Sequence, residues 1–69
     1  MTTKDAHADN DEILTIEEVS EILKVPTGTI RKWRTERMGP RGFRVGKYVR
    51  FRRSSVELFI TEREAEQDY

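Results

Sequence analysis

Pro26 limits what this chain can form more than any other residue, because it lies between two short amphipathic segments. The residue before a proline resists the helical conformation, so a helix approaching Pro26 must end near Lys24. The proline itself suits the start of a new helix, and Gly28 follows two positions later. The sequence therefore predicts two short helices joined by a tight turn of about four residues, which is the arrangement of a helix-turn-helix.

The first predicted helix has a clear start signal. Thr15 is followed three residues later by Glu18, which is the pattern of a capping box. The apolar residues after this start fall on one side of a helix of 3.6 residues per turn: Ile16, Val19, Ile22 and Leu23. Three glutamates fall on the opposite side, so one face of this helix should be buried and the other solvated.

The second predicted helix runs from about residue 27 or 28 to Arg37, where Met38-Gly39-Pro40 stops it. Ile30 and Trp33 lie on its inner stripe together with Arg37, and Trp33 is expected to pack in the core rather than stack on a base. The opposite face carries small and cationic residues, namely Gly28, Arg31, Lys32 and Thr35, with Arg34 on the flank.

A short cationic hairpin is predicted from residue 43 to residue 53. A two-residue loop at Gly46-Lys47 would mix apolar and charged residues on both faces. A three-residue loop that includes Tyr48 pairs Phe43 with Phe51 and collects the apolar side chains on one face. Because a one-residue slip moves every side chain to the other face, the sorted register is the one we expect.

Ser54 is expected to open the last helix, with Glu57 completing a second capping box. Val56, Phe59 and Ile60 form its predicted buried stripe, and Leu58 points away from it. The domain boundaries that follow are a disordered acidic tail at residues 1–11, the folded domain at residues 12–62 and an acidic end at residues 63–69.

The charges are strongly segregated, although the 69 residues have no net charge. Residues 25–56 contain ten Lys or Arg against Glu36 alone, whereas the segments on both sides are acidic. A surface of one sign suits a polyanion such as DNA. The acidic ends have two interpretations: they promote solubility, or they offer an acidic surface to a basic partner.

The composition argues against several classes of function. The chain has no cysteine, and its one histidine, His7, lies in the acidic tail, so we expect no enzyme activity, no metal and no cofactor. No segment has the length of an apolar membrane span or signal peptide. We expect a soluble cytoplasmic protein, associated with DNA in a bacterial host, without membrane or small-molecule ligands.

The order of parts resembles a known family. The segments LTIEEVSEILKVPTGTIRKW, FRVGKYVRF and SSVELFI are similar to the compact winged helix-turn-helix domains of phage excisionases, also called recombination directionality factors, and to the DNA-binding head of MerR-type regulators. The resemblance covers Ile13 to Ile60 and implies a small α+β fold. MerR-type regulators continue into a dimerisation helix and an effector domain, and metal-sensing members use cysteines, so the excisionase or small-regulator branch is favoured.

Two sets of residues are candidates for DNA contact. The recognition helix would enter the major groove with Thr27, Gly28, Thr29, Arg31, Lys32, Arg34 and Thr35. The wing and the preceding link would reach the minor groove and phosphates with Arg41, Arg44, Lys47, Tyr48, Arg50, Arg52 and Arg53. The alternative for the wing cations is edge protection, in which charge on an exposed strand prevents pairing between molecules.

The resemblance implies a DNA-architectural factor that helps an integrase excise a phage, with the integrase and adjacent copies of the protein as partners on double-stranded DNA. The alternatives are a small MerR- or AlpA-like transcriptional regulator with the same fold, and a protein-interaction module that acts on a basic partner. The residues alone do not separate the first two.

Overall fold

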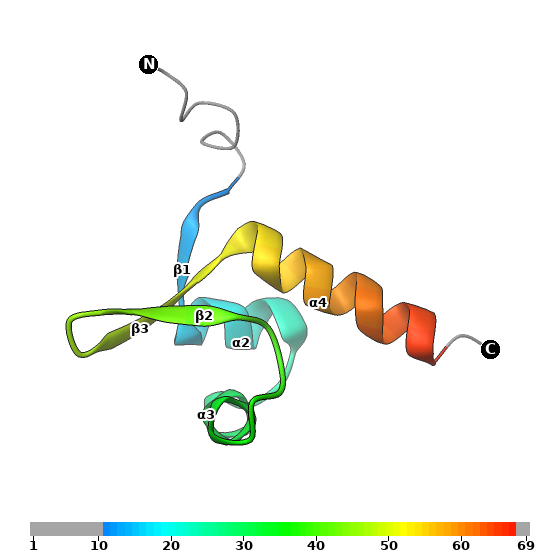
Figure 1. Ribbon diagram of the computed structural model, residues 1–69, viewed down its shortest axis with the longest axis horizontal. Coiled ribbons are helices and arrows are strands. Elements are labelled where there is room, and N and C mark those ends of the chain that lie inside the picture. Colours follow the sequence, from blue (N-terminus) through cyan, green and yellow to red (C-terminus); the bar gives the residue numbers. More distant parts are fainter. Residues whose placement is uncertain (1–10, 68–69) are drawn as a thin grey trace, which may run out of the picture.

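The computed structural model describes residues 11–67. Six elements follow one another along this part of the chain: β1 (Ile13–Thr15), α2 (Ile16–Leu23), α3 (Thr27–Thr35), β2 (Gly42–Val45), β3 (Tyr48–Arg52) and α4 (Arg53–Glu66) (Figure 1). This is the predicted small α+β winged helix-turn-helix, with one more strand than the sequence indicated. No helix formed by residues 11–67 combines the length and the hydropathy that crossing a membrane requires.

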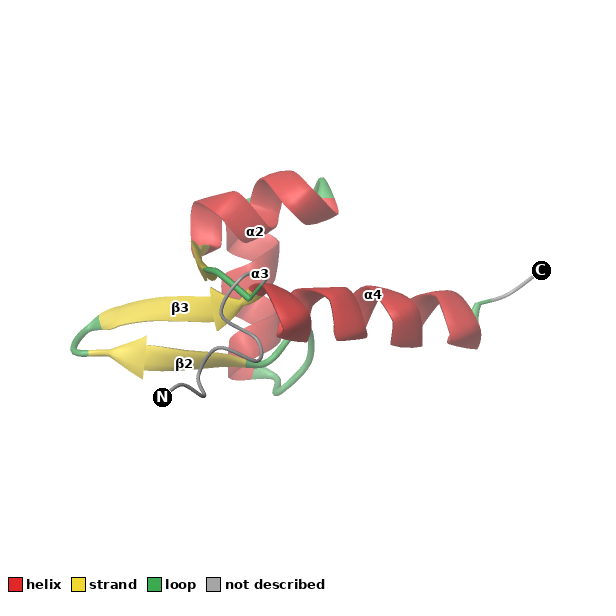
Figure 2. Ribbon diagram, turned by 90° about the horizontal axis from the view of Figure 1, so that it is seen from above, coloured by secondary structure: helices red, strands yellow, loops and turns green. Residues whose placement is uncertain are grey.

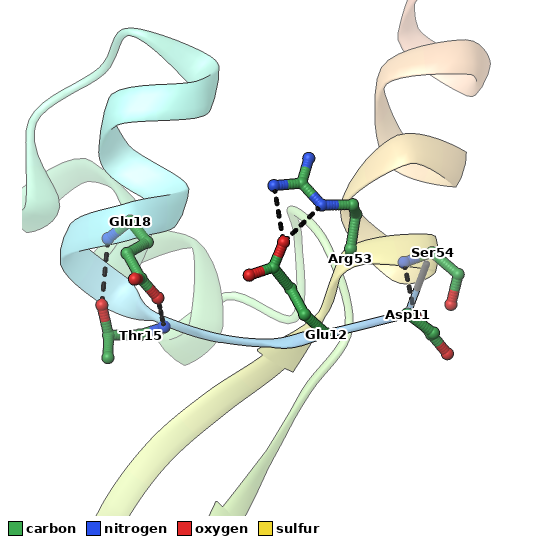
Figure 3. Close-up of polar contacts among 6 residues, drawn as sticks. All are labelled: Asp11, Glu12, Thr15, Glu18, Arg53 and Ser54. Carbon is green, nitrogen blue, oxygen red and sulfur yellow. Dashed lines mark hydrogen bonds and ion pairs between the residues drawn. The ribbon is translucent and has the colours of Figure 1, made fainter. Parts of the chain in front are cut away.

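The helix-turn-helix forms as the sequence predicts. The backbone N–H of Thr15 donates to Glu18 Oε1 at 2.8 Å, and the N–H of Glu18 donates to Thr15 Oγ1 at 3.1 Å, so the capping box is complete (Figure 3). Helix α2 ends at Lys24, which takes a left-handed conformation with φ of 60°. Pro26 then provides the N-cap of α3, and its carbonyl oxygen accepts hydrogen bonds from the backbone N–H groups of Thr29 and Ile30 in the first turn.

The sheet has three antiparallel strands in the order β1-β3-β2, so β3 lies in the middle. Strand β1 was not predicted. Its Leu14 lies opposite Phe51 of β3, and both side chains are almost completely buried. They share one face of the sheet with the core, where Val19, Ile30 and Val56 arrive from the three helices. Because β1 pairs with β3 and leads directly into α2, it connects the wing to the helix-turn-helix.

The predicted register of the hairpin is wrong. The strands pair Val45 with Tyr48 and Phe43 with Arg50, which leaves Gly46-Lys47 as a two-residue loop. Gly46 has a φ of 64°, and a glycine at the first central position is what a type II′ turn requires. The reason lies at the other end of the hairpin, where Gly42 faces Phe51.

A side chain at position 42 would collide with the Phe51 ring. A Cβ placed on Gly42 would lie only 2.8 Å from Phe51 Cε2. The expected register would have put the second ring, Phe43, opposite Phe51 on this face. The ring of Phe51 already fills that space, so Phe43 is turned to the outer face and is 38% exposed, not buried as expected.

The outer face of the sheet is consequently uncovered. Alternation along the strands places four exposed apolar side chains on it, with the arginines of β3 between them: Ile13, Phe43, Val45 and Tyr48. We refer to these four residues as the outer sheet patch.

The start of α4 also differs from the prediction. Ser54 does not form a capping box with Glu57, and the N-cap position is occupied by Arg52, which makes no side-chain cap. Instead, the backbone N–H of Ser54 donates to Asp11 Oδ1 at 2.9 Å (Figure 3). Asp11, which the sequence analysis assigned to a disordered tail, is thus the residue that caps α4; residues 1–10 of that predicted tail, including His7, lie outside the described residues.

Helix α4 is longer than predicted, because it continues through Arg63 to Glu66. Its first half packs on the core through Val56 and Ile60, and Leu58 is 57% exposed, as expected. Its second half extends away from the sheet, opposite the hairpin along the longest axis of the molecule (Figures 1 and 2).

Candidate nucleic-acid interface

The outer face of α3 carries the predicted major-groove residues. Arg31, Lys32 and Thr35 are exposed, and no atom lies within 4 Å of where a Cβ on Gly28 would be. The Thr35 hydroxyl donates to the carbonyl oxygen of Arg31 at 3.3 Å, so it is available to an outside partner only as an acceptor. Lys32 Nζ lies 3.9 Å from Glu36 Oε2. This ion pair is exposed, so separating its two charges costs little free energy.

The threonines at the start of α3 do not act as side-chain caps, because Pro26 holds that position. Thr27 and Thr29 are half-buried. Within residues 11–67, the backbone amides of Thr27 and Gly28 have no hydrogen-bond partner. Such amides at a helix start can donate to a phosphate oxygen, and the positive end of the helix dipole favours that anion.

A groove of about 390 Å³ brings the recognition helix and the tip of the wing together. Arg31 of α3 lines one side, and Lys47, Tyr48 and Arg50 of the hairpin line the other. The remaining lining residues come from β1, α2 and β3: Thr15, Ile16, Glu17 and Val49. The groove therefore places cations from both predicted DNA-contact sets beside one continuous depression.

Tyr48 organises the cations at the wing tip. The Arg50 guanidinium lies 5.1 Å from the Tyr48 ring centroid and Lys47 Nζ lies 5.7 Å from it, both within cation–π range. Arg50 also donates to the carbonyl of Val49 at 2.8 Å. With Tyr48 itself 54% exposed, the tip presents an aromatic ring flanked by two positive charges.

A second basic groove, of about 240 Å³, lies between α3 and the link to the wing. Arg34, Arg37 and Arg41 all line it, and Arg34 Nη1 lies close against the backbone of Gly42. Helical periodicity placed Arg37 on the inner stripe of a longer helix, so Arg37 was not among the predicted contacts. The helix ends at Thr35, and Arg37 takes a left-handed conformation with φ of 60°, which turns it off that stripe. The charge of Arg37, which does not suit an apolar stripe, is the signal that could have indicated this.

Arg52 and Arg53 do not belong to the tip of the wing. They lie at the other end of β3, where Arg52 Nη1 is 3.2 Å from Asp11 Oδ2 and Arg53 Nη2 is 3.0 Å from Glu12 Oε1. We call these two contacts the N-terminal clasp. Arg44, in contrast, is exposed in the middle of β2 on the same sheet face as Val49.

The clasp also affects the protonation of Asp11. The hydrogen bond from the Ser54 backbone N–H, helped by Arg52, lowers the pKa of Asp11 below its ordinary value of 3.8. Asp11 is therefore charged at neutral pH and keeps Arg52 partly neutralised.

The other cations of residues 25–56 form an uncompensated surface. Within residues 11–67, seven of them have no ion pair: Arg31, Arg34, Arg37, Arg41, Arg44, Lys47 and Arg50. These seven come from α3, the link and the hairpin, which are the elements that a winged helix-turn-helix presents to DNA. Glu17 and Glu36 are the nearby acids, and both are exposed.

Comparison with known proteins agrees with this geometry. Residues 13–64 match the helix-turn-helix domain family, which is found in excisionase and AlpA-like proteins. No curated protein and no solved structure gave a significant match. The matched region runs from β1 into the second half of α4 and so contains both basic grooves. The chain therefore belongs to this helix-turn-helix family, and its function is sequence-specific binding of DNA.

Proposed function

We propose that the protein is an excisionase, a DNA-architectural factor that helps an integrase remove a phage from a chromosome. It would bind beside the attachment sequence, alone or as adjacent copies, and bend the duplex so that the integrase complex can assemble. The observation that carries the proposal is the groove in which Arg31 of α3 meets Lys47, Tyr48 and Arg50 of the wing.

This groove supports contact with two neighbouring grooves of a duplex at once. The helix would read base edges in the major groove, where an arginine can donate to guanine O6 and N7. The cationic wing tip would follow the phosphates into the minor groove, whose negative potential is enhanced where it is narrow. A protein that holds both grooves favours one local shape of DNA, which is what an architectural factor must do.

A small transcriptional regulator of the AlpA type is the second candidate, since the matched family is found in both kinds of protein. The same surface would bind a promoter without any need for an integrase. No enzyme activity is part of either proposal, because both roles need only binding.

The test is a recombination assay with a phage integrase and DNA carrying the left and right attachment sites of that integrase, with and without the protein. We expect excision to depend on the protein and to fall when the Arg31→Ala variant replaces it. Arg53→Ala is the control and should leave excision unchanged, because Arg53 is paired with Glu12 away from the wing tip. Protection mapping on the same DNA should show protected sites at both arms.

Two other results are informative. If excision proceeds equally with and without the protein, while promoter DNA is protected and a reporter gene responds, the regulator is the correct assignment. If neither DNA is protected at moderate salt, the DNA-binding surface itself is misassigned.

A further inference from the structure

A groove at the opposite end of the molecule from the wing tip is lined by none of the predicted DNA-contact residues. Its volume is about 540 Å³, and it lies between the end of α2, the inner side of α3 and the second half of α4. Its floor is apolar and consists of Leu23, Val25, Trp33, Met38, Phe59 and Ile60. The Trp33 and Phe59 rings, whose centroids are 5.5 Å apart, form the centre of this floor.

The second half of α4 forms one wall of the groove and has solvent on its other sides. Every residue from Thr61 to Gln67 is exposed. In two perpendicular views this part of α4 extends beyond the rest of the fold (Figures 1 and 2). A helix end that leaves the core without covering it, beside an apolar depression, is a typical place for another chain to dock.

The rim of the groove is acidic. Glu62, Glu64 and Glu66 line it, with Arg63 as the one cation among the lining residues. Arg63 is paired with Glu66 at 3.2 Å, so Glu62 and Glu64 have no ion pair within the part of the chain that the structure describes. An apolar floor beside two uncompensated carboxylates complements a ligand that has an apolar side and, next to it, a positively charged side.

We propose that this groove binds a basic amphipathic helix of a partner protein. The apolar side of that helix would cover Trp33 and Phe59, and its lysines or arginines would face Glu62 and Glu64. Docking of an amphipathic helix into a groove between helices is a common mode of peptide recognition, with apolar anchors about three to four residues apart.

Charge argues against two occupants that this chain itself could supply. The helix of a second copy that extends beyond its own fold is α4, which carries Glu57, Glu62, Glu64 and Glu66 and would be repelled by the acidic rim. The cationic side chains of a second copy lie on α3, the link and the hairpin, the surface that DNA would occupy. Residues 1–10 contain two aspartates against one lysine, and their only apolar side chains are Met1 and two alanines. Neither segment offers the basic and strongly apolar combination that the groove complements.

The proposal does not depend on the excision or regulatory role. The second half of α4 and the hairpin extend in opposite directions (Figure 2), and the apolar groove shares no lining residue with the groove of Arg31 and the wing tip. A helix bound beside α4 would therefore leave the groove of Arg31 and the wing tip open. The protein could therefore hold DNA and a basic partner at the same time and connect the two.

Trp33 provides a direct readout, because it is the only tryptophan in the chain and it lines the groove. The probe is a synthetic peptide of about 14 residues, or about four helical turns, with leucines on one side and lysines elsewhere. A twin peptide has glutamates in place of the lysines. We expect the lysine peptide to shift Trp33 emission in a saturable titration of the full chain, and the glutamate peptide to give no shift.

A matched pair of variants tests where the peptide binds. Glu62→Lys with Glu64→Lys should weaken the lysine peptide by about tenfold or more, which corresponds to about 1.4 kcal/mol. Glu57→Lys lies on the same helix but outside the groove, so it should leave the affinity unchanged. Both variants should retain the far-ultraviolet circular dichroism of the parent protein, and neither should lose DNA affinity, because each adds positive charge.

Three results would overturn the proposal. They are no saturable Trp33 response to the lysine peptide, equal weakening by Glu57→Lys and by the double variant, and equal binding of both peptides. Sedimentation that shows a dimer, broken up by the double variant, would assign the groove to a second copy instead. Loss of DNA binding in the parent protein would affect the proposed function but not this result, since the two readouts are separate.

Discussion

Asp11 Oδ1 accepts a hydrogen bond from the backbone N–H of Ser54 at 2.9 Å, although the two residues are 43 positions apart. The contact places the beginning of the described chain on the first turn of α4. A helix start has backbone amides without internal partners, and here a residue from outside the helix satisfies one of them. Asp11 also pairs with Arg52, so a single carboxylate serves the helix and the base of the wing.

Replacement of Asp11 should therefore destabilise the fold. We expect Asp11→Ala to lower the free energy of unfolding, and Asp11→Asn to lower it less, because asparagine still offers an oxygen to Ser54 but has no charge for Arg52. Urea denaturation at neutral pH measures both. A result in which the alanine variant is as stable as the parent would show that the cap contributes nothing.

The stability should also depend on pH through Asp11. Its pKa is lowered in the folded protein, so the unfolded chain binds more protons below the ordinary value of 3.8. The contribution of Asp11 is therefore complete above that value and is lost as the pH falls through the lower, folded pKa. The difference in stability between the parent and Asp11→Asn, measured by urea denaturation in steps of pH, should shrink over that acidic range.

DNA affinity should depend on Arg31 of α3 but not on Arg53 at the start of α4. Arg31→Ala should weaken binding, because Arg31 lines the groove shared with the wing tip, whereas Arg53→Ala should change it by less than about twofold, because Arg53 is paired with Glu12. With about six phosphate contacts, the logarithm of the affinity should fall against the logarithm of salt with a slope near −5. Fluorescence anisotropy with a labelled duplex at several salt concentrations measures both quantities. Equal weakening by the two variants would mean that the N-terminal clasp opens on DNA.

Substitution by alanine should destabilise the protein at Gly42 and stabilise it at Gly28. At Gly42 the new Cβ would lie 2.8 Å from the Phe51 ring, which is itself fully buried and cannot yield easily, so Gly42→Ala should cost about 1–3 kcal/mol. At Gly28 the Cβ would meet open space on a helix, so Gly28→Ala should stabilise by about 0.4–1 kcal/mol. Urea denaturation of both variants provides the comparison. Equal stabilities would contradict the close packing between the two strands.

Replacing Lys24 with glycine should stabilise the protein. It is exposed at the C-cap of α2 with φ of 60°, a conformation that costs a residue with a Cβ about 1–2 kcal/mol but is open to glycine. After the entropy that glycine loses on folding, we expect Lys24→Gly to stabilise the protein by about 0.5–1 kcal/mol. Lys24→Ala is the control, since it removes the same side chain and keeps the Cβ, and its midpoint in a thermal melt should not rise.

The helix-turn-helix could be predicted from the sequence because its signals are local. The capping box at Thr15 and Glu18 and the break at Pro26 involve residues within a few positions of each other, and the structure confirms them. The exposure of Leu58 follows from the period of a single helix and is also confirmed. Local signals of this kind depend little on what the rest of the chain does.

The features that were not predicted depend on distant residues. The register of the hairpin is decided by Gly42 and Phe51 together with Leu14 of β1, and a rule that sorts side chains by polarity takes none of these contacts into account. Ser54 and Glu57 have the spacing of a capping box, but Asp11 occupies that role from the other end of the domain. Asp11 also pairs with Arg52, at the end of β3 away from the wing tip. The contacts of Asp11 therefore account for two wrong predictions, the cap of α4 and the place of Arg52.

The outer sheet patch has a practical consequence for solution work. Arg50 and Arg52 separate its four apolar side chains, so their charges oppose association between molecules through this face of the sheet. Arg50→Ala would remove a predicted DNA contact. It would also remove the charge that separates two parts of the apolar outer sheet patch. Glutamine is the better replacement there, because precipitation would otherwise be mistaken for a loss of affinity.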